Sequence, residues 1–161
     1  MIVVCNTSPI IALACAGQLE LLRAVYGEIL VPVAVFDEIT VAGAGAPGTR
    51  EVAEAAWIKL RPALNAPLVN ALSLELDAGE AQAIALAVES GAGLILLDER
   101  LGRRAAQRLG LTVTGTLGVL IAAKDRGLLA SLRPVLDALR ANSGFWIGED
   151  LYNAVLAAGN E

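Results

Sequence analysis

Two oxygen-bearing side chains, Asn6 and Asp98, come directly after apolar runs that are typical of buried strands. Asn6 follows residues 2–5 (IVVC), and Asp98 follows residues 94–97 (LILL). Because ligands of open parallel sheets bind beyond the carboxyl ends of the strands, both side chains are candidates for a functional site. Asn and Asp are also frequent after strands as Asx turns or helix caps, so this alternative stays open for each residue.

Glu38 and Glu80 lie beside the apolar faces of two expected helices. With about 100° per residue, each carboxylate borders a stripe of apolar residues that should face the core. A carboxylate turned half towards a core is costly unless something neutralises it, and a divalent cation shared by several such groups would do so. Two simpler interpretations stay open: Glu38 as an exposed helix glutamate, and Glu80 as half of a capping box with Asp77. The stripes are Val35, Ile39 and Ala42 in the first helix and Ala83, Ile84 and Ala87 in the second.

Histidine is absent from the chain, and this narrows the available chemistry. The absence excludes Ser-His-Asp and Cys-His nucleophile systems, histidine acid–base pairs and every zinc site that contains histidine. The two cysteines, Cys5 and Cys15, lie in apolar runs without C-x-x-C spacing, which is typical of buried structural cysteines. Carboxylates, hydroxyls, lysine and arginine remain, and these groups favour a hard cation with oxygen ligands, such as Mg²⁺ or Mn²⁺.

The composition is typical of one folded domain. The chain has 161 residues, of which 56% are apolar and 18% charged, and its mean hydropathy is +0.62. These values exclude a disordered chain. The longest apolar run, residues 9–17, is too short to cross a membrane, and no basic segment precedes an apolar stretch at the N-terminus as in a signal peptide. We therefore expect a cytoplasmic protein with no membrane association.

The net charge of −5 comes from 12 Lys and Arg residues against 17 Asp and Glu residues. Such an acidic chain is not expected to coat nucleic acid through electrostatics, although it can still be a nuclease that holds a metal in an acidic pit. Charge is uneven, because residues 100–126 contain six positive side chains and one negative one. A solvated helix face and a local basic patch both account for this segment. The positive residues are Arg100, Arg103, Arg104, Arg108, Lys124 and Arg126, and the negative one is Asp125.

Familiar nucleotide-binding motifs are missing: the chain has neither G-x-x-x-x-G-K-[ST] nor G-x-G-x-x-G after a strand. Residues 115–118 (GTLG) precede a helix, so the backbone N–H groups around Thr116 could bind an anion, and a plain turn is the alternative. Trp57 and Trp146 form no stacking stripe of the kind that single-strand binders use. We expect both tryptophans in the core.

Segments typical of strands and helices alternate along the whole chain. Apolar strands separated by helices predict an α/β domain with a doubly wound, mainly parallel sheet and helices on both faces. We expect a single domain over residues 1–161, with a core of about residues 1–140 and a helical extension over about residues 141–161. Ser8 is expected to cap the first helix and Pro9 to begin it. Strands are expected at residues 2–5, 28–31, 57–60, 94–97 and 111–113, with an edge strand at 145–147, and helices at 9–16, 18–25, 32–41, 50–56, 77–89, 99–109, 117–126, 134–141 and 149–158.

Four blocks of sequence, in this order, resemble the PIN-domain proteins. They are NTSPIIALA after the first strand, LDAGEAQAIALA, LLDERLGRRAA and TGTLGVLIAAK. The chain is most similar to a VapC-toxin-like branch described as predicted nucleic-acid-binding proteins. The resemblance implies a doubly wound α/β fold and a Mg²⁺- or Mn²⁺-dependent ribonuclease, often the toxin of a toxin–antitoxin pair. The partners that it implies are an RNA substrate, a cognate antitoxin protein and a second copy of the chain in a homodimer.

The acidic quartet of this family falls on the same residues that the spacing nominates, Asn6, Glu38, Glu80 and Asp98. The resemblance implies that these groups hold one or two metal ions and activate hydroxide against a phosphodiester, which requires no histidine. The family usually has Asp where this chain has Asn6. An amide oxygen can still ligate a hard cation, but the site loses a negative charge, so metal affinity should fall. A weak or inactive natural domain, an enzyme tolerant of Asn and an engineered substitution each account for Asn6.

The resemblance also implies roles for residues around the quartet. Ser8 would fix the loop or a metal-bound water, and Arg103 and Lys124 match basic positions that could contact phosphate. With Thr116, they make up the candidate substrate-binding residues. The main hypothesis is therefore a PIN-type endoribonuclease. One alternative is a catalytically inactive PIN domain that binds RNA or protein. Another is a flavodoxin-like domain that binds a small molecule, which the missing phosphate loop disfavours.

Overall fold

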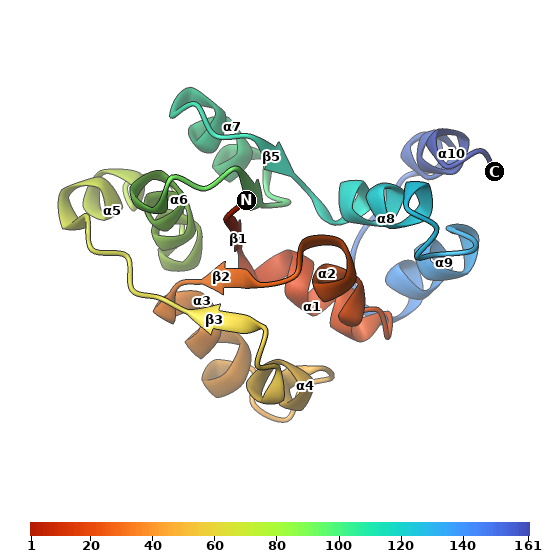
Figure 1. Cartoon of the computed structure of the whole chain (residues 1–161), viewed down its shortest axis with the longest axis horizontal. Coiled ribbons are helices and arrows are strands. Elements are labelled where there is room, and N and C mark those ends of the chain that lie inside the picture. Colours follow the sequence, from red (N-terminus) through yellow and green to blue (C-terminus); the bar gives the residue numbers. More distant parts are fainter.

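The computed structural model describes residues 1–161 and contains one five-stranded sheet, in which all strands are parallel. The strand order is β3-β2-β1-β4-β5, so the chain starts in the middle of the sheet, winds to one edge and then to the other (Figure 1). The doubly wound α/β class predicted from the sequence is confirmed. The strands are β1 Val3–Cys5, β2 Ile29–Val31, β3 Ile58–Leu60, β4 Leu94–Leu96 and β5 Val113–Thr114.

Helices connect the strands and cover both faces of the sheet (Figure 1). None of these helices combines the length and the apolar character that a membrane span requires. The helices are α1 Thr7–Cys15, α2 Glu20–Tyr26, α3 Val33–Asp37, the π-helical segment η1 Glu38–Ala42, α4 Thr49–Glu54, α5 Ala66–Leu72, α6 Ala78–Ser90, α7 Arg100–Arg108, α8 Thr116–Asp125, α9 Arg133–Asn142 and α10 Glu149–Ala158.

Alternation along the strands divides the hydrophobic core into two clusters, because successive strand residues point to opposite faces of the sheet. In β1, Val3 and Cys5 belong to the larger cluster, and Val4 between them belongs to the smaller one. In β4, Leu96 belongs to the larger cluster and Ile95 to the smaller. Residues of α1, α2, α8, α9 and α10 complete the larger cluster, and residues of α6 and α7 complete the smaller one. Burial on both faces explains why the central strands β1 and β4 are wholly apolar, whereas the edge strand β3 contains the exposed Lys59.

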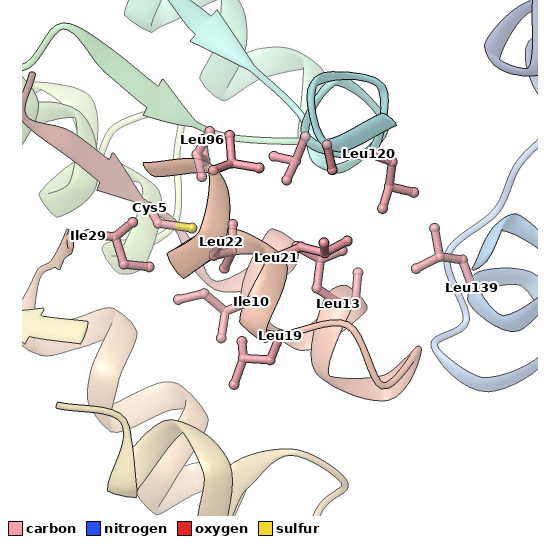
Figure 2. Packing of buried hydrophobic residues seen from close by; sticks show 14 of the residues in the cluster. Cys5, Ile10, Leu13, Leu19, Leu21, Leu22, Ile29, Leu96, Leu120 and Leu139 are labelled. Atoms are coloured by element: carbon pink, nitrogen blue, oxygen red, sulfur yellow. The ribbon is translucent and has the colours of Figure 1, made fainter. Parts of the chain in front are cut away.

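Side chains from α1 and α2 lie within the larger cluster, as Figure 2 shows. Ile10, Leu13 and Leu22 have 0% exposure and lie between Cys5 of the sheet and Leu120 of α8. Each fully buried side chain of this size stabilises the fold by about 1.5–3 kcal/mol. α1 begins immediately after Asn6, so this packing also fixes the backbone that carries Asn6.

The helix after β2 changes its hydrogen-bonding pattern at Glu38, where α3 gives way to η1. Val35 and Ile39 are buried as predicted, but Ala42 is exposed. The extra residue in a π-helical turn rotates the following positions away from the stripe that a regular α-helix would form, and this explains the error at Ala42. Such turns are frequent at functional sites, and here the turn begins at a candidate residue.

The first helix begins two residues earlier than predicted. Asn6, and not Ser8, takes the N-cap position with an extended backbone, and Thr7 is the first helical residue. Pro9 is accommodated as the third residue of α1, because the first N–H groups of a helix have no helical partner. Asn6 is thereby placed at the junction of β1 and α1.

The segment between α9 and α10 also differs from the prediction. Residues 145–147 form no strand, and Trp146 is 85% exposed, whereas Trp57 is buried as expected. Ile147 packs into the larger core cluster, and the Arg140 guanidinium donates a hydrogen bond to its carbonyl oxygen at 2.8 Å. The Arg140 side chain therefore provides the hydrogen bond that the Ile147 carbonyl oxygen would have formed with a neighbouring strand.

Helix α5 was not expected from the sequence. Its residues are not fully buried, and it lies against α6. The Asn65 side chain caps it by accepting a hydrogen bond from the Leu68 N–H at 3.2 Å. The Glu89 carboxylate of α6 accepts hydrogen bonds from the N–H groups of Leu64 and Asn65 at 2.8 and 2.9 Å. These polar contacts between distant segments, which no local pattern reveals, position the start of α5.

Candidate active site

Asn6 lies at the carboxyl end of the central strand β1 and is almost completely buried, with 3% exposure. Its backbone N–H donates to the Leu96 carbonyl of the neighbouring strand at 3.0 Å. Its side-chain Oδ1 has no hydrogen-bond partner. A buried amide oxygen without a donor is costly, because it has lost its water and gained nothing in return. This oxygen is therefore a candidate to ligate a cation or to accept a hydrogen bond from a substrate.

Gly79 shows which groups surround this oxygen. A methyl group on its Cα would lie 3.1 Å from Glu38 Oε2, 3.4 Å from Asn6 Oδ1 and 3.5 Å from Asp77 Oδ1. Three oxygens from three segments of the chain therefore lie around one glycine, and the missing side chain leaves the space between them. Packing of α3 on α6 brings Glu38 there. A hollow of about 540 Å³ opens beside these groups, with Glu38, Asp77 and Gly79 in its wall.

Glu38 is held in this position by a neighbour of Asn6. The Thr7 hydroxyl donates a hydrogen bond to Glu38 Oε2 at 2.8 Å. Thr7 is buried at the start of α1, so its geometry is fixed by the same packing that fixes Asn6. The sequence interpretation did not single out Thr7, although its place between Asn6 and Ser8 is a signal for it.

Glu80 forms the capping box that the sequence left open as an alternative. Its backbone N–H donates to Asp77 Oδ1 at 2.8 Å, and its Oε2 accepts from the Asp77 N–H at 3.3 Å. Burial raises the pKa of the Glu80 carboxyl above its usual value, and the negative charge of Asp77 raises it further. The charges of Glu99 and Glu38 act in the same direction, whereas the hydrogen bond from the Asp77 backbone lowers the pKa. The Glu80 side chain is thus engaged in capping its own helix.

Asp98 is bound at both carboxylate oxygens by Thr116 at the start of α8. The Thr116 backbone N–H donates to Oδ1 and its hydroxyl donates to Oδ2, both at 2.7 Å. Burial nevertheless raises the pKa of the Asp98 carboxyl, outweighing the lowering by these hydrogen bonds. The negative charge of Glu99 also raises this pKa, and the Arg103 guanidinium lowers it. Thr116 is completely buried and engaged with Asp98, so the structure gives it a positioning contact with a carboxylate.

Arg103 and Ser8 lie at the same edge. Arg103 Nη1 donates to the Leu97 carbonyl at 3.1 Å, and a methyl group at Gly115 would lie 2.9 Å from this nitrogen and 2.7 Å from Asp98 Oδ1. Gly115 therefore allows Asp98 and Arg103 to approach the start of α8. The Ser8 hydroxyl donates a hydrogen bond to Glu99. Glu99 was not among the sequence candidates, although its position directly after Asp98 could have drawn attention to it.

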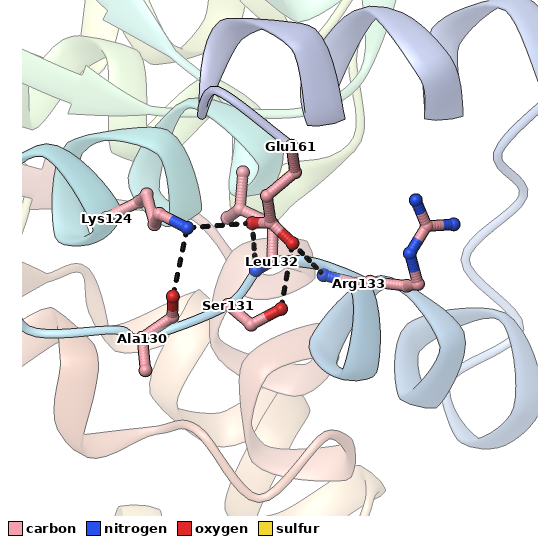
Figure 3. Close-up of polar contacts among 6 residues, drawn as sticks. All are labelled: Lys124, Ala130, Ser131, Leu132, Arg133 and Glu161. Atoms are coloured by element: carbon pink, nitrogen blue, oxygen red, sulfur yellow. Dashed lines mark hydrogen bonds and ion pairs between the residues drawn. The ribbon is translucent and has the colours of Figure 1, made fainter.

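Lys124 is not brought to this edge. It lies eight residues after Thr116 on α8, about 12 Å further along the helix axis. Its ammonium group donates to the Ala130 carbonyl at 2.9 Å and forms an ion pair with Glu161 at 3.0 Å (Figure 3). The Glu161 carboxylate also accepts a hydrogen bond from the Ser131 hydroxyl at 2.8 Å. Contrary to the sequence interpretation, these contacts give Lys124 a structural position remote from Asp98.

The donors at the sheet edge fit a hard cation in kind, because amide and carboxylate oxygens are the ligands that Mg²⁺ and Mn²⁺ prefer. The unpartnered, buried Oδ1 of Asn6 beside Glu38 is the observation that supports this fit. No group of three or more His, Cys, Asp or Glu side chains is arranged to hold a metal ion. Glu80 and Asp98, the other two candidates, are bound to Asp77 and Thr116.

A family model described as a PIN domain (DUF3368) matches residues 2–161. No curated protein and no solved structure matches the chain. PIN domains are typically nucleases and generally depend on metal ions. The match covers nearly the whole chain, and the parallel five-stranded sheet, with oxygen-bearing side chains at its carboxyl edge, agrees with it. The chain belongs to the PIN-domain family.

Proposed function

We propose that this protein is a metal-dependent endoribonuclease of the VapC type, acting in the cytoplasm as the toxin of a toxin–antitoxin pair. The observation that carries the nuclease assignment is the orphaned Oδ1 of Asn6, which is buried and lies with Glu38 around Gly79. A cation would satisfy this oxygen and neutralise the neighbouring carboxylates at the same time. Family membership supports the reaction class.

Asn6 and Glu38 would hold the cation, with Asp98 and Glu80 as further ligands from the neighbouring segments. When bound, a divalent cation at such a site supplies Lewis acidity and lowers the pKa of water that attacks a phosphodiester. The chain itself prepares the ligands: Thr7 orients Glu38, and Thr116 orients Asp98. Ser8 holds Glu99 at the rim of the site.

Arg103 is the candidate for substrate charge at this edge. Its guanidinium lies beside Asp98 and is half-buried, with one nitrogen bound to the Leu97 carbonyl. The remaining N–H groups are available to a phosphate oxygen, and arginine suits this task because of its planar set of donors. Arg103 would thus bind or orient the phosphate next to the carboxylates.

A second function, that of an inactive PIN domain which binds RNA or protein, is favoured by one observation. Asn6, at the centre of the carboxyl edge of the sheet, is an amide, and no three carboxylates are arranged to hold a metal ion. Loss of one ligand charge weakens the binding of a divalent cation and therefore the activation of water. Measurement of cleavage separates the two functions.

The decisive experiment compares RNA cleavage by the natural chain and by Asn6→Asp, Glu38→Gln and Asp98→Asn, each with Mn²⁺, Mg²⁺ or EDTA. We expect weak cleavage by the natural chain, faster cleavage by Asn6→Asp, and none by the other two or in EDTA. Glu51→Gln, an exposed change in α4, is the matched control and should behave as the natural chain does. A folded Asn6→Asp variant that cleaves no RNA would leave the binding module as the function.

The toxin role and the partners need separate tests. Induced expression of Asn6→Asp in bacteria should arrest growth, and co-expression of a small protein encoded beside the gene should relieve the arrest if that protein is the antitoxin. We also propose a homodimer, as the family resemblance implies, in which a second copy would cover exposed apolar side chains such as Leu64, Leu74 and Trp146. Light scattering that gives a mass of 16.6 kDa at all concentrations would exclude the dimer.

A further inference from the structure

Three arginines of α7 stand apart from the other cations of the chain. Of the 12 Lys and Arg residues, only Arg61, Arg100, Arg104 and Arg108 take part in no ion pair, side-chain hydrogen bond or stacking on an aromatic ring. Arg100, Arg104 and Arg108 are exposed and share one helix. In a chain with a net charge of −5, an unpaired group of positive charges is the exception.

The spacing of these residues forms a stripe. Positions four apart lie on one face of an α-helix, separated by about 6 Å along its axis, so the stripe is about 12 Å long. The opposite face of α7 carries Gly102 and Ala106, which are buried against the sheet. The arginines therefore point away from the core. We call Arg100, Arg104 and Arg108 the α7 arginine stripe.

The stripe begins at the candidate active site. Glu99 is the N-cap of α7 and follows Asp98, so Arg100 lies next to the carboxylate edge and Arg108 lies furthest from it. A hollow of about 410 Å³ is lined by Arg104, Arg108, Leu101 and Glu75. Glu75 is two residues before Asp77, so this hollow lies between the stripe and the segment that enters the site. Glu75 is the one carboxylate in the hollow and forms no ion pair with the two arginines.

We propose that the α7 arginine stripe binds the phosphodiester backbone of a single-stranded nucleic acid and guides it into the candidate active site. The inference rests on the proposed function for the destination of the strand, but the binding itself requires no cleavage. A row of unpaired guanidinium groups is complementary to a row of phosphates, and arginine binds phosphate through two parallel hydrogen bonds. Contacts of this kind position a strand without reading its sequence.

The test measures binding of a short fluorescein-labelled single-stranded RNA by fluorescence anisotropy, in EDTA so that no metal-dependent cleavage takes place. It compares the natural chain with the triple variant Arg100→Gln, Arg104→Gln and Arg108→Gln. A triple variant with lysine at these positions keeps the charge. The matched control is the triple variant Arg23→Gln, Arg50→Gln and Lys59→Gln, which removes three other exposed cations that form surface ion pairs.

We expect the α7 glutamine variant to bind the RNA more than about tenfold more weakly than the natural chain at about 50 mM salt. In a plot of the logarithm of affinity against the logarithm of salt concentration, its slope should be shallower by about 2. The lysine variant should retain most of the affinity, and the control should change little. The same sequence as DNA should show the same loss, because phosphate contacts do not read the 2′-hydroxyl. Thermal melts should show all variants folded, because the exchanged side chains make no contacts within the core.

Equal losses in the α7 variant and in the control would overturn the proposal, because the effect would then follow net charge alone. Unchanged RNA binding together with lost binding of poly-L-glutamate would also overturn it and indicate an acidic protein partner. The proposed nuclease can fail independently of the stripe. If RNA binds through the stripe but Asn6→Asp cleaves no RNA, the nuclease proposal is wrong and the binding proposal stands. If the α7 glutamine variant cleaves RNA with an unchanged KM, the binding proposal is wrong and the nuclease proposal stands.

Discussion

The carboxylate of Asp98 is bound at both oxygens by one residue, Thr116, whose backbone N–H and hydroxyl each donate a hydrogen bond of 2.7 Å. Asp98 follows β4 and Thr116 begins α8 after β5, so the contact joins two neighbouring strand ends. Because Thr116 is completely buried, the orientation of Asp98 is set by the core and not by solvent. A carboxylate that is held in this way would meet a cation without rearrangement.

Replacement of Thr116 by valine should show how much this contact contributes. Valine keeps the shape of the side chain but removes the hydroxyl donor, so Asp98 loses one of its two bonds. We expect the free energy of unfolding to fall by about 1–3 kcal/mol, as for a hydrogen bond to a charged, partly buried group. Urea denaturation measures the change. In an Asp98→Asn background the same substitution should cost less, and an equal cost in both backgrounds would show that the hydroxyl does not act through Asp98.

Gly79 offers a substitution that separates stability from ligand binding. A methyl group at this position would lie 3.1 Å from Glu38 Oε2, which is the end of a flexible side chain and can move by a few tenths of an ångström. Alanine is also a better helix former than glycine by about 1 kcal/mol. We therefore expect the free energy of unfolding of Gly79→Ala to lie within about 1 kcal/mol of that of the natural chain. The rise in melting temperature on addition of Mn²⁺ should be smaller for Gly79→Ala.

The control for Gly79→Ala is the same change in a Glu38→Ala background. Without the Glu38 carboxylate nothing has to move, so the glycine substitution should then increase the stability by about the helix-propensity difference of 1 kcal/mol. A Mn²⁺-induced rise in melting temperature that is identical for Gly79→Ala and the natural chain would show that the oxygens around Gly79 bind no cation.

The sequence predicted the central strands β1 and β4 well because each is an apolar run that is buried on both faces. Residues 2–5 became Val3–Cys5 and residues 94–97 became Leu94–Leu96, with Asn6 and Asp98 just beyond the ends. The parallel sheet then brings these strand ends to one edge without further information. This is why two of the candidate residues could be located from short segments alone.

The side-chain partners at that edge could not be predicted in the same way, since they depend on contacts between distant segments. The π-helical turn at Glu38 and the hydrogen bond from Thr7 arise from packing of α1 and α6 against the helix after β2. Thr116 meets Asp98 only because β5 lies beside β4. Lys124, which matches a family block as well as Arg103 does, is turned towards Glu161 by the C-terminal segment.

Glu161 should make the stability of the protein depend on pH in the acidic range. Its carboxylate accepts hydrogen bonds from the Leu132 N–H, the Ser131 hydroxyl and the Lys124 ammonium group (Figure 3). The bond from the Leu132 backbone, followed by the Ser131 hydroxyl and Lys124, lowers the pKa of Glu161 from 4.5 to about 2. An acid whose pKa is lowered by folding stabilises the folded state above its unfolded pKa, and this contribution is lost as the pH falls through the folded pKa.

The expected result is therefore a difference in stability between the natural chain and Glu161→Gln that is largest above pH 4.5 and vanishes towards pH 2. Urea denaturation at several pH values measures this difference. Glu51→Gln, at an exposed position of α4, is the control and should show no such pH dependence. A difference that stays constant from pH 7 down to pH 2 would mean that Glu161 acts through packing and not through its charge.

Asn6→Asp should lower the stability of the metal-free protein and strengthen its response to metal. The new carboxylate would take the place of a buried amide that lies with Glu38 around Gly79, and unneutralised carboxylates around one glycine repel each other. A divalent cation removes this repulsion, so Mn²⁺ should raise the melting temperature of Asn6→Asp more than that of the natural chain, because a ligand stabilises in proportion to its occupancy of the folded state. Asn6→Ser, which keeps a small polar oxygen but adds no charge, is the control and should not gain this response. Equal metal-free stability of Asn6→Asp and the natural chain, together with equal shifts on addition of Mn²⁺, would mean that residue 6 is not a metal ligand, and the carboxyl end of β1 would lose its place in the site.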